Sequence, residues 1–293
     1  MKARLQRAGL FLRQAVAGLG GAIAYGRARR VRGPAPRVMS GGAVETASIF
    51  VLVASLIAAS MILLDPLIPG LRLQLPHGLV RVFERITDLG LGSVVLWPVG
   101  IAWLVVLGAM PELKDMNRRV AAALAARIGF VFTCVAGVGL FVLVLKYVLG
   151  RARPYMALHL PGPHPVLTFD WFALQASFSS FPSGHSTVVF ATACAFAALY
   201  PRARTALFAV AVLVAFSRVV LGSHYPSDVL AGGALAILFS CFMVKAFAAR
   251  RLVFSVAPDG AVHPMPGPSA RRLARLVARG SHSQRSALEE ARP

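Results

Sequence analysis

The sequence predicts an all-α protein, a bundle of six transmembrane helices with a polar site at the outer membrane-water interface. Of its 293 residues, 57% are hydrophobic and 14% are charged, whereas about a quarter of a soluble domain is charged. The mean hydropathy is +0.69, which is also higher than is typical of a soluble domain. The apolar residues gather in segments that approach the roughly 20 residues needed to span a bilayer.

The predicted spans divide the chain into three parts. Residues 1–43 form a basic N-terminal segment, residues 44–249 the membrane domain and residues 250–293 a basic tail. The fourth and fifth spans are short and closely spaced, so we expect them to form a tight helical hairpin. The six predicted spans are residues 44–64, 89–110, 121–149, 186–200, 205–221 and 229–249.

The basic residues predict how the bundle is oriented. The formal net charge is +20, and Lys and Arg lie in the tails and short loops around the apolar segments. This distribution suits contact with anionic membrane lipids and argues against a nucleic-acid partner, which is bound by a basic but otherwise polar fold. Of 31 Lys and Arg residues, 24 fall on the side that holds both termini. Cytoplasmic loops carry the excess of positive charge, so we expect both termini in the cytoplasm and the polar site on the outer side.

The segments outside the predicted spans carry weaker signals. Arg13 interrupts the first apolar stretch, so an interfacial amphipathic helix or a disordered segment fits the N-terminus better than a signal peptide. Residues 269–279 of the tail predict either a short basic helix or an unstructured chain. The three cysteines lie within apolar segments and are interpreted as small buried residues.

Three polar stretches lie where apolar residues would be expected, and all fall at the same predicted membrane face. They are residues 146–154, 182–185 and 217–228. Ionisable residues near a bilayer are costly unless they pair or take part in function. Each residue alone has a simple structural explanation, since cations snorkel to headgroups and Ser-Gly caps helices. Their coincidence on one face favours a functional site.

Five residues in these stretches predict a phosphate-binding site. Guanidinium groups hold phosphate oxygens in pairs, and the free N–H groups and positive dipole end of a helix start attract anions. Glycine lets the backbone approach an oxyanion closely. The cations are Lys146, Arg153 and Arg218, and the helix start is formed by Ser183 and Gly184.

Two histidines and one carboxylate predict acid–base and nucleophilic chemistry at the same face. His224 and Asp228 are four residues apart, with Pro226 opening the sixth helix between them. Asp228 can accept one imidazole N–H and fix the tautomer, which leaves the other nitrogen of His224 free to attack. His185 can protonate a leaving oxygen.

At these positions the sequence resembles the type 2 phosphatidic acid phosphatase superfamily, which includes bacterial lipid phosphatases and the vanadium haloperoxidases. The family signature is Lys, six residues, Arg-Pro; then Pro-Ser-Gly-His; then Ser-Arg, five residues, His, three residues, Asp. Lys146 to Pro154, Pro182 to His185 and Ser217 to Asp228 match it at every position. The resemblance covers about residues 90–249 and does not reach the basic tails.

The resemblance implies a metal-independent lipid phosphatase without a cofactor, in a bacterial inner (plasma) membrane. It implies that His224 forms a phosphohistidine, that Asp228 orients it and that His185 protonates the leaving group. Lys146, Arg153, Ser183, Gly184 and Arg218 would then bind the phosphate. Candidate substrates are lipid A phosphate, undecaprenyl pyrophosphate, phosphatidylglycerol phosphate and phosphatidate. The sequence predicts no oligomeric state.

Two other functions fit parts of the pattern. A lipid phosphotransferase would use the same phosphohistidine and differ only in the acceptor. A non-enzymatic membrane transporter or anion-binding protein is disfavoured, because transporters place polar groups near the bilayer midplane whereas these cluster at one end. A haloperoxidase is disfavoured by the six spans. The predicted cradle contacts only phosphate, so we expect the external loops 65–88 and 155–181 to determine specificity.

Overall fold

The structure, a computed structural model, describes residues 2–38 and 42–274. Most of these residues are helical, and a short antiparallel hairpin pairs Phe254 with Pro264. The helices are α1 (Lys2–Ala28), α2 (Ala43–Leu63), α3 (His77–Asp88), α4 (Gly92–Ala109), α5 (Asp115–Leu149), α6 (Pro154–Ala157), α7 (Gly184–Leu199), α8 (Arg204–Val220) and α9 (Pro226–Ala249). Short 3-10 turns include η1 (Asp65–Leu67) and η2 (Leu71–Gln74), and the strands are β1 (Phe254–Val256) and β2 (Val262–Pro264).

The helices account for the six predicted spans. Within the described part of the chain, five helical segments are long and apolar enough to cross a membrane, and α7 is a shorter apolar helix of 16 residues. At about 1.5 Å per residue, α7 is shorter than a bilayer core is thick. The all-α, six-span fold class is confirmed. The predicted hairpin of the fourth and fifth spans is also present, as α7 and α8 joined by a single 3-10 turn at Pro201–Ala203.

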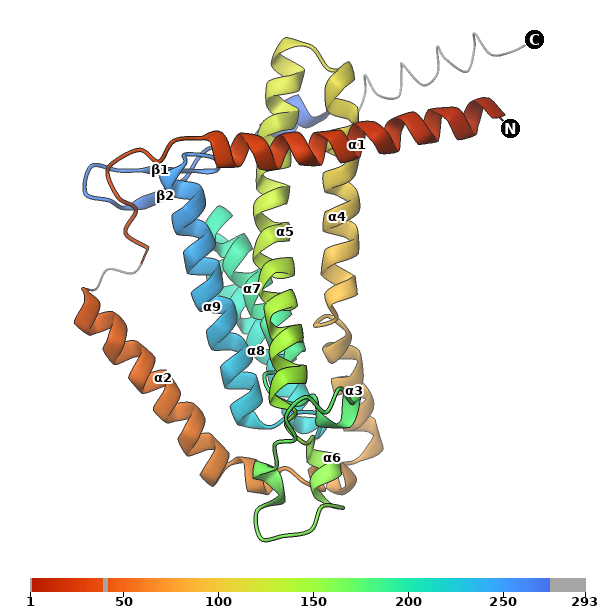
Figure 1. The fold of residues 1–293 in the computed structure, drawn as a ribbon, viewed down its shortest axis with the longest axis vertical. Helices are drawn as coiled ribbons and strands as arrows, with labels where there is room; N and C mark the ends of the chain where they lie inside the picture. Colours follow the sequence, from red (N-terminus) through yellow and green to blue (C-terminus); the bar gives the residue numbers. More distant parts are fainter. Residues whose placement is uncertain (1, 39–41, 275–293) are drawn as a thin grey trace.

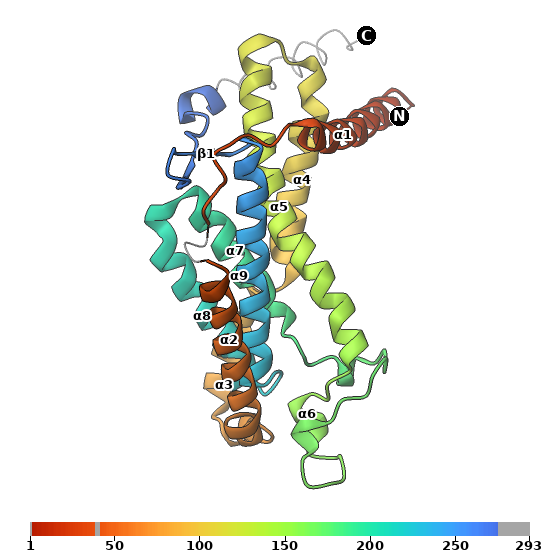
Figure 2. The same ribbon diagram turned by 60° about the vertical axis from the view of Figure 1, so that its left-hand side comes forward.

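Helix α5 runs along the bundle beside α7 and α9, with α8 behind them and α4 at its flank (Figure 1). The core between α5, α7 and α9 consists of small and branched residues, among them Val135, Val138, Val142, Ala191 and Ala236. Small residues let membrane helices approach closely, because van der Waals packing rather than hydrophobic burial holds them together in lipid. Helix α2 stands at the edge of the bundle in Figure 1 and in front of α9 in Figure 2, with most of its side chains exposed.

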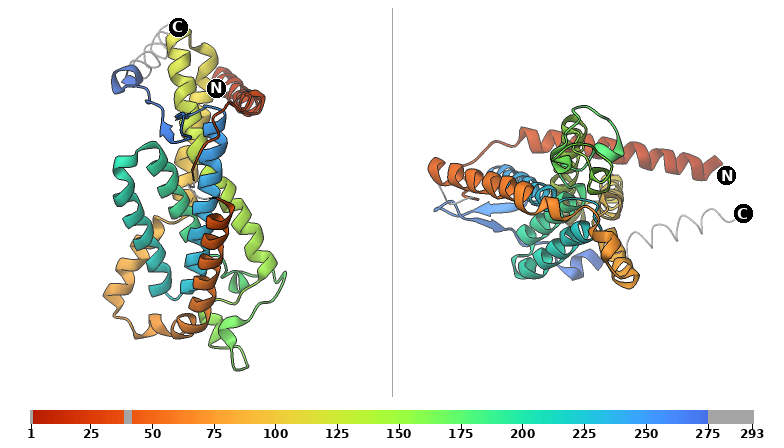
Figure 3. Two further views of the ribbon diagram at one scale, coloured as in Figure 1. Left: turned by 90° about the vertical axis from the view of Figure 1, so that its left-hand side faces the viewer. Right: turned by 90° about the horizontal axis from the view of Figure 1, so that it is seen from below.

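The N-terminal segment is helical rather than disordered. Helix α1 lies across the bundle at the end that also carries the β1–β2 hairpin (Figures 1 and 3). It packs on α4, where Leu107 lies against Gly18 and the ring of Phe11 lies against Gly108. In the predicted basic helix of the tail, residues 270–274 are helical, and residues 275–279 lie outside the described residues.

The region between the first two spans differs from the prediction. Residues 65–88 were expected to form a loop, but they contain η1, η2 and the 12-residue helix α3. Helix α3 packs its apolar side against α8, with Phe83 edge-on to Phe216 and with Val80 and Thr87 buried. The apolar side of α3 is too short to span a membrane, so the pattern of apolar segments did not predict this helix. Helix α3 leads almost directly into α4 through Gly90.

Candidate active site

The residues predicted to form the site come together at one end of the bundle, opposite α1 and the hairpin. Lys146 lies in the last turn of α5, Arg218 in the last turn of α8, and Asp228 in the first turn of α9. His185 begins α7 with Gly184, and His224 lies in the connection between α8 and α9. These helix ends meet because α5 and α8 run toward this face while α7 and α9 run away from it (Figure 3).

The first turn of α7 is prepared for an anion. The Ser183 side chain caps the helix by accepting from the backbone N–H of Ser186, and the Ser183 N–H donates to the carbonyl oxygen of Asp228 over 2.9 Å. Ser183 is fully buried by these contacts, so it positions the turn. The N–H groups of Gly184 and His185 make no hydrogen bond to other described residues. The Lys146 ammonium lies 3.7 Å from where a Cβ on Gly184 would stand, so it adds positive charge to this helix start.

Gly232 of α9 lets the first turn of α7 pack closely against α9, because glycine has no side chain. A Cβ at Gly232 would lie 2.5 Å from the Ser183 carbonyl oxygen and 3.0 Å from the Thr187 hydroxyl. We therefore expect Gly232→Ala to push the start of α7 out of place, with a loss of about 1–3 kcal/mol in stability and about tenfold or more in activity. Thermal unfolding and phosphate release by the purified protein measure both effects.

Gly233→Ala is the matched control for this prediction. A Cβ there would lie 3.3 Å from the aromatic ring of Phe190, which can turn aside, and it faces no backbone atom. Equal activities of the two variants would contradict the role assigned to Gly232.

Two arginines border the same site from different elements. Arg153 follows α5 and donates through Nε to the carbonyl oxygen of Ala176 over 2.9 Å, which ties it to loop 155–181. Arg218 donates through Nη1 to the hydroxyl of Thr87 in α3 over 2.9 Å, while its buried Nε has no partner among the described residues. A buried donor without a partner costs free energy, so this guanidinium is suited to receive an anion.

His224 faces Asp228 within the buried end of the site. Its Nδ1 lies 3.5 Å from Asp228 Oδ2, which is an ion-pair contact slightly longer than a hydrogen bond, and both side chains are nearly or fully buried. With Nδ1 facing the carboxylate, Nε2 is the nitrogen left for other contacts. Burial lowers the pKa of His224 to about 3, although Asp228 acts in the opposite direction. The imidazole is therefore neutral at physiological pH, as a nucleophile must be.

The lowered pKa of His224 has a consequence for stability against acid. In the unfolded chain this histidine titrates near 6.5. Between pH 6.5 and 3, the unfolded state binds a proton that the folded state excludes, so stability falls as the pH drops. We expect the unfolding free energy of the wild type to fall more steeply below pH 6.5 than that of His224→Gln, by up to about 1.4 kcal/mol per pH unit. Equal slopes in detergent-solubilised protein would contradict a neutral, buried His224.

The structure also places residues in the site that the sequence did not assign. Arg151, two residues before Arg153, is fully buried and bonds to Asp228 and to Asp65. The Ser180 hydroxyl donates to Asp228, and the Thr87 hydroxyl accepts from Arg218. Arg151 lies within a polar stretch that the sequence singled out, but its spacing does not reveal that it points inward.

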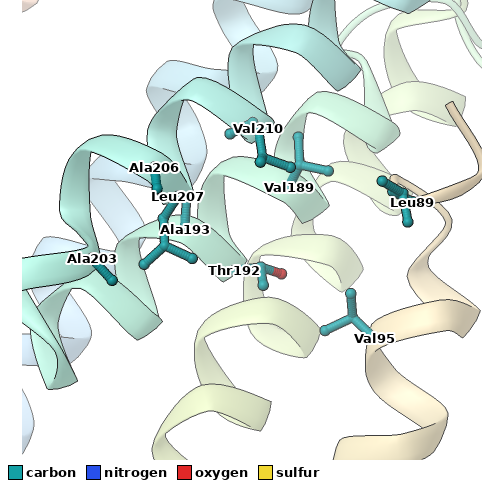
Figure 4. Close-up of a pocket in the computed structure, with 10 residues that line it drawn as sticks. Leu89, Val95, Val189, Thr192, Ala193, Ala203, Ala206, Leu207 and Val210 are labelled. Carbon is teal, nitrogen blue, oxygen red and sulfur yellow. The ribbon is translucent and has the colours of Figure 1, made fainter. Parts of the chain in front are cut away.

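An apolar crevice of about 280 Å³ lies beside this polar cluster, between α7, α8 and α4 (Figure 4). Leu89, Val189 and Val210 are among its lining residues, and Thr192 supplies its polar atom. Leu89 lines one edge of the crevice, and the next residue, Gly90, packs directly against the ring of His185. Its lining suits hydrocarbon, whereas the cations and helix start next to it suit an anion.

Comparisons with known sequences agree on one family. A sequence model of the PAP2 superfamily matches residues 127–252. A lipid A 1-phosphatase of Rhizobium etli is 36% identical over 221 residues, which is 74% of this chain and 89% of that protein. A lipid A 1-phosphatase of Rhizobium johnstonii is 40% identical over 166 residues, or 56% of this chain and 64% of that protein. The crystal structure of a PAP2-type phosphatidylglycerolphosphate phosphatase from Bacillus subtilis matches with a TM-score of 0.42 and 23% identity, over 67% of this chain and 92% of that one.

Proposed function

Because the chain belongs to the PAP2 superfamily and is a membrane lipid phosphatase, we propose that it removes the 1-phosphate of lipid A through a phosphohistidine on His224. The observation that carries the chemistry is the meeting of three cations, the open start of α7 and a neutral, buried histidine at one end of the bundle. The choice of lipid A rests on the likeness to two lipid A 1-phosphatases.

The proposed reaction has two balanced steps. In the first, the lone pair of His224 Nε2 attacks phosphorus, the bond from phosphorus to the lipid oxygen breaks, and that oxygen takes a proton from the imidazolium form of His185, which becomes neutral. Lys146, Arg218 and the N–H groups at the start of α7 stabilise the negative charge on the phosphoryl oxygens. In the second step, water attacks phosphorus, its proton passes to His185, and the phosphorus–nitrogen bond electrons return to His224.

The apolar crevice supports a lipid as the substrate. A phosphate held at the start of α7 would lie next to Gly90 and Leu89, where the crevice begins. A hydrocarbon chain attached to that phosphate could continue along α7 and α8 without leaving apolar surroundings. A soluble phosphate ester has no hydrocarbon chain to bury in this crevice.

The substrate is tested with protein purified in detergent and a panel of lipid phosphates. The panel contains lipid A, undecaprenyl pyrophosphate, phosphatidylglycerol phosphate and phosphatidate. We expect the highest kcat/KM with lipid A and loss of the phosphate at position 1, as read by mass spectrometry of the product. A clear preference for another member would reject lipid A while leaving the phosphatase chemistry intact.

The same assay separates hydrolysis from phosphate transfer. A hydrolase releases inorganic phosphate without an added acceptor lipid, whereas a phosphotransferase requires the acceptor. Because Lys146, Arg153 and Arg218 supply the positive charge that a metal supplies elsewhere, we expect full activity in excess EDTA. Loss of activity in EDTA, restored by a divalent cation, would contradict this mechanism.

We further propose that both termini lie in the cytoplasm and that the site opens to the periplasm. The support is the excess of Lys and Arg at the end of the bundle opposite the site. Reporter fusions that are active only in the periplasm should be inactive at either terminus and active when inserted in loop 155–181. The reverse pattern would place the site on the cytoplasmic side.

A further inference from the structure

A fully buried arginine lies between two fully buried carboxylates next to the catalytic histidine. Arg151 donates through Nη1 to Asp228 Oδ1 over 2.6 Å and through Nη2 to Asp65 Oδ2 over 2.8 Å. Its guanidinium also lies over the ring of Tyr225, 4.3 Å from the centroid, and bonds to the carbonyl oxygen of Val166. Neither Arg151 nor Asp65 belongs to the three-part motif.

The two oxygens of Asp228 have different partners. Oδ1 bonds to Arg151, whereas Oδ2 accepts from the Ser180 hydroxyl over 2.6 Å and from the Tyr225 N–H over 2.9 Å. Oδ2 is also the atom that faces His224 Nδ1. The orientation of this carboxylate toward the histidine is therefore set by three donors from different parts of the chain.

Asp65 is attached to the same cluster at the opposite side. It lies in η1, directly after α2, and accepts from the Ser227 N–H over 3.1 Å and from the Ser227 hydroxyl. The Ser227 hydroxyl in turn accepts from Arg151 Nη1 over 2.7 Å. These bonds fasten the end of the otherwise exposed helix α2 to the first turn of α9, where Asp228 is located.

The charges in this cluster do not cancel. One guanidinium and two carboxylates leave a net charge of −1 in a region that water does not reach. If Arg151 paired with Asp228 alone, the positive and negative charges would match and little field would remain at His224. Charges interact strongly at such low effective dielectric, so the presence of a second carboxylate matters for the reaction.

We propose that Asp65 is a positioning residue that shares Arg151 with Asp228, so that Asp228 keeps enough negative charge to stabilise His224 as its ring becomes positive. The ring gains positive charge when Nε2 bonds to phosphorus, because Nδ1 keeps its proton. Lys146 and Arg153 also act on His224, and both oppose this charge. The proposal rests on the proposed function, in which His224 is the nucleophile.

Three variants separate charge from structure. Asp65→Asn changes the net charge of the cluster from −1 to 0 and keeps a side chain of the same shape. Arg151→Met leaves two buried carboxylates facing each other without a cation. Asp65→Asn combined with Arg151→Met returns the net charge to −1. Asp88→Asn is the matched control, because it removes the charge of an exposed carboxylate at the end of α3, outside the buried cluster.

For Asp65→Asn we expect kcat to fall by about 10- to 100-fold, with KM within about threefold of the wild-type value. Vanadate accepts the lone pair of a histidine nitrogen, so its inhibition constant should weaken by a similar factor. Inorganic phosphate contacts only the cationic cradle, so its inhibition constant should stay unchanged. The double variant should be at least about tenfold more active than Arg151→Met.

Several outcomes would overturn the proposal. Wild-type kcat and vanadate inhibition in Asp65→Asn would do so, as would a double variant no more active than Arg151→Met. If vanadate and phosphate inhibition weaken together while the unfolding temperature drops, Asp65 has a structural role only. Failure of the proposed function is recognised separately, because the wild-type protein would then yield no acid-labile phosphohistidine when quenched during turnover.

Discussion

Replacing His224 with alanine is expected to lower kcat by at least about 10⁴-fold, because the variant loses the nitrogen that forms the covalent intermediate in the proposed mechanism. The side chain is buried beside Asp228, and its imidazole is neutral at neutral pH. Its removal leaves the cations and the start of α7 in place, so the variant should still bind lipid phosphate. We therefore expect KM, or the dissociation constant of a non-hydrolysable analogue, to change by less than about fivefold.

Two measurements check this expectation. Phosphate release from the preferred lipid gives kcat, and rapid quenching with labelled substrate detects the phosphohistidine, which should be present in the wild type and absent in the variant. His159→Ala is the matched control, because His159 lies exposed in loop 155–181. A His224→Ala protein that retains more than about 1% of wild-type kcat would refute the mechanism.

Replacing Gly150 with alanine is expected to have the largest effect on the fold. Gly150 ends α5 in the left-handed region, with φ of +58°, and a Cβ there would overlap the carbonyl oxygen of Asp170. The left-handed conformation alone costs alanine about 1–2 kcal/mol. The collision is with backbone, so no side-chain movement relieves it, and the segment around Asp170 must shift.

That shift would reach the active site directly. The Gly150 carbonyl oxygen accepts from the Asp170 N–H over 2.8 Å. The backbone of Arg151 forms an isolated antiparallel β-bridge with that of Phe169 in the same segment. Displacing the segment therefore displaces Arg151 from Asp65 and Asp228. We expect a total loss of at least about 3 kcal/mol, seen as poor yield of folded protein and a strongly lowered unfolding temperature in detergent.

Gly139→Ala in the same helix provides the comparison. Apart from its chain neighbours and the backbone of its own helical turns, no atom of the described residues lies within 4 Å of where its Cβ would stand, and the residue has ordinary helical geometry. This variant should be as stable as the wild type or slightly more stable, since alanine favours helix more than glycine does. Similar yields and unfolding temperatures for the two variants would contradict the role assigned to Gly150.

The outline of the fold could be predicted because apolar length is a local property. Helix α9 begins at Pro226, as the proline indicated, and α5 and α8 end at Leu149 and Val220, at or next to the predicted ends of their spans. Helix α3 was missed for the opposite reason. Its apolar side is too short to span a membrane, and only its packing against α8 makes it a defined element.

The sequence alone determined which residues gather at one end of the bundle, because the spans alternate in direction and the motif residues lie at their ends. It did not determine what each polar residue does there. Arg153 was assigned to phosphate and Arg151 was assigned no role, yet Arg151 is the one buried between two carboxylates, whereas Arg153 borders the site. Ser183 was assigned to phosphate, and in the structure its hydroxyl caps α7.

Tertiary structure decided these roles because burial and partner choice depend on residues that are distant in the chain. Asp65 and Ser227 are 162 positions apart, and Arg218 is 131 positions from Thr87. A buried charge is stable only where such partners surround it. A local sequence pattern does not predict which distant residues these partners are. The feature that only the structure reveals is therefore the shared arginine that links the end of α2 to the carboxylate behind His224.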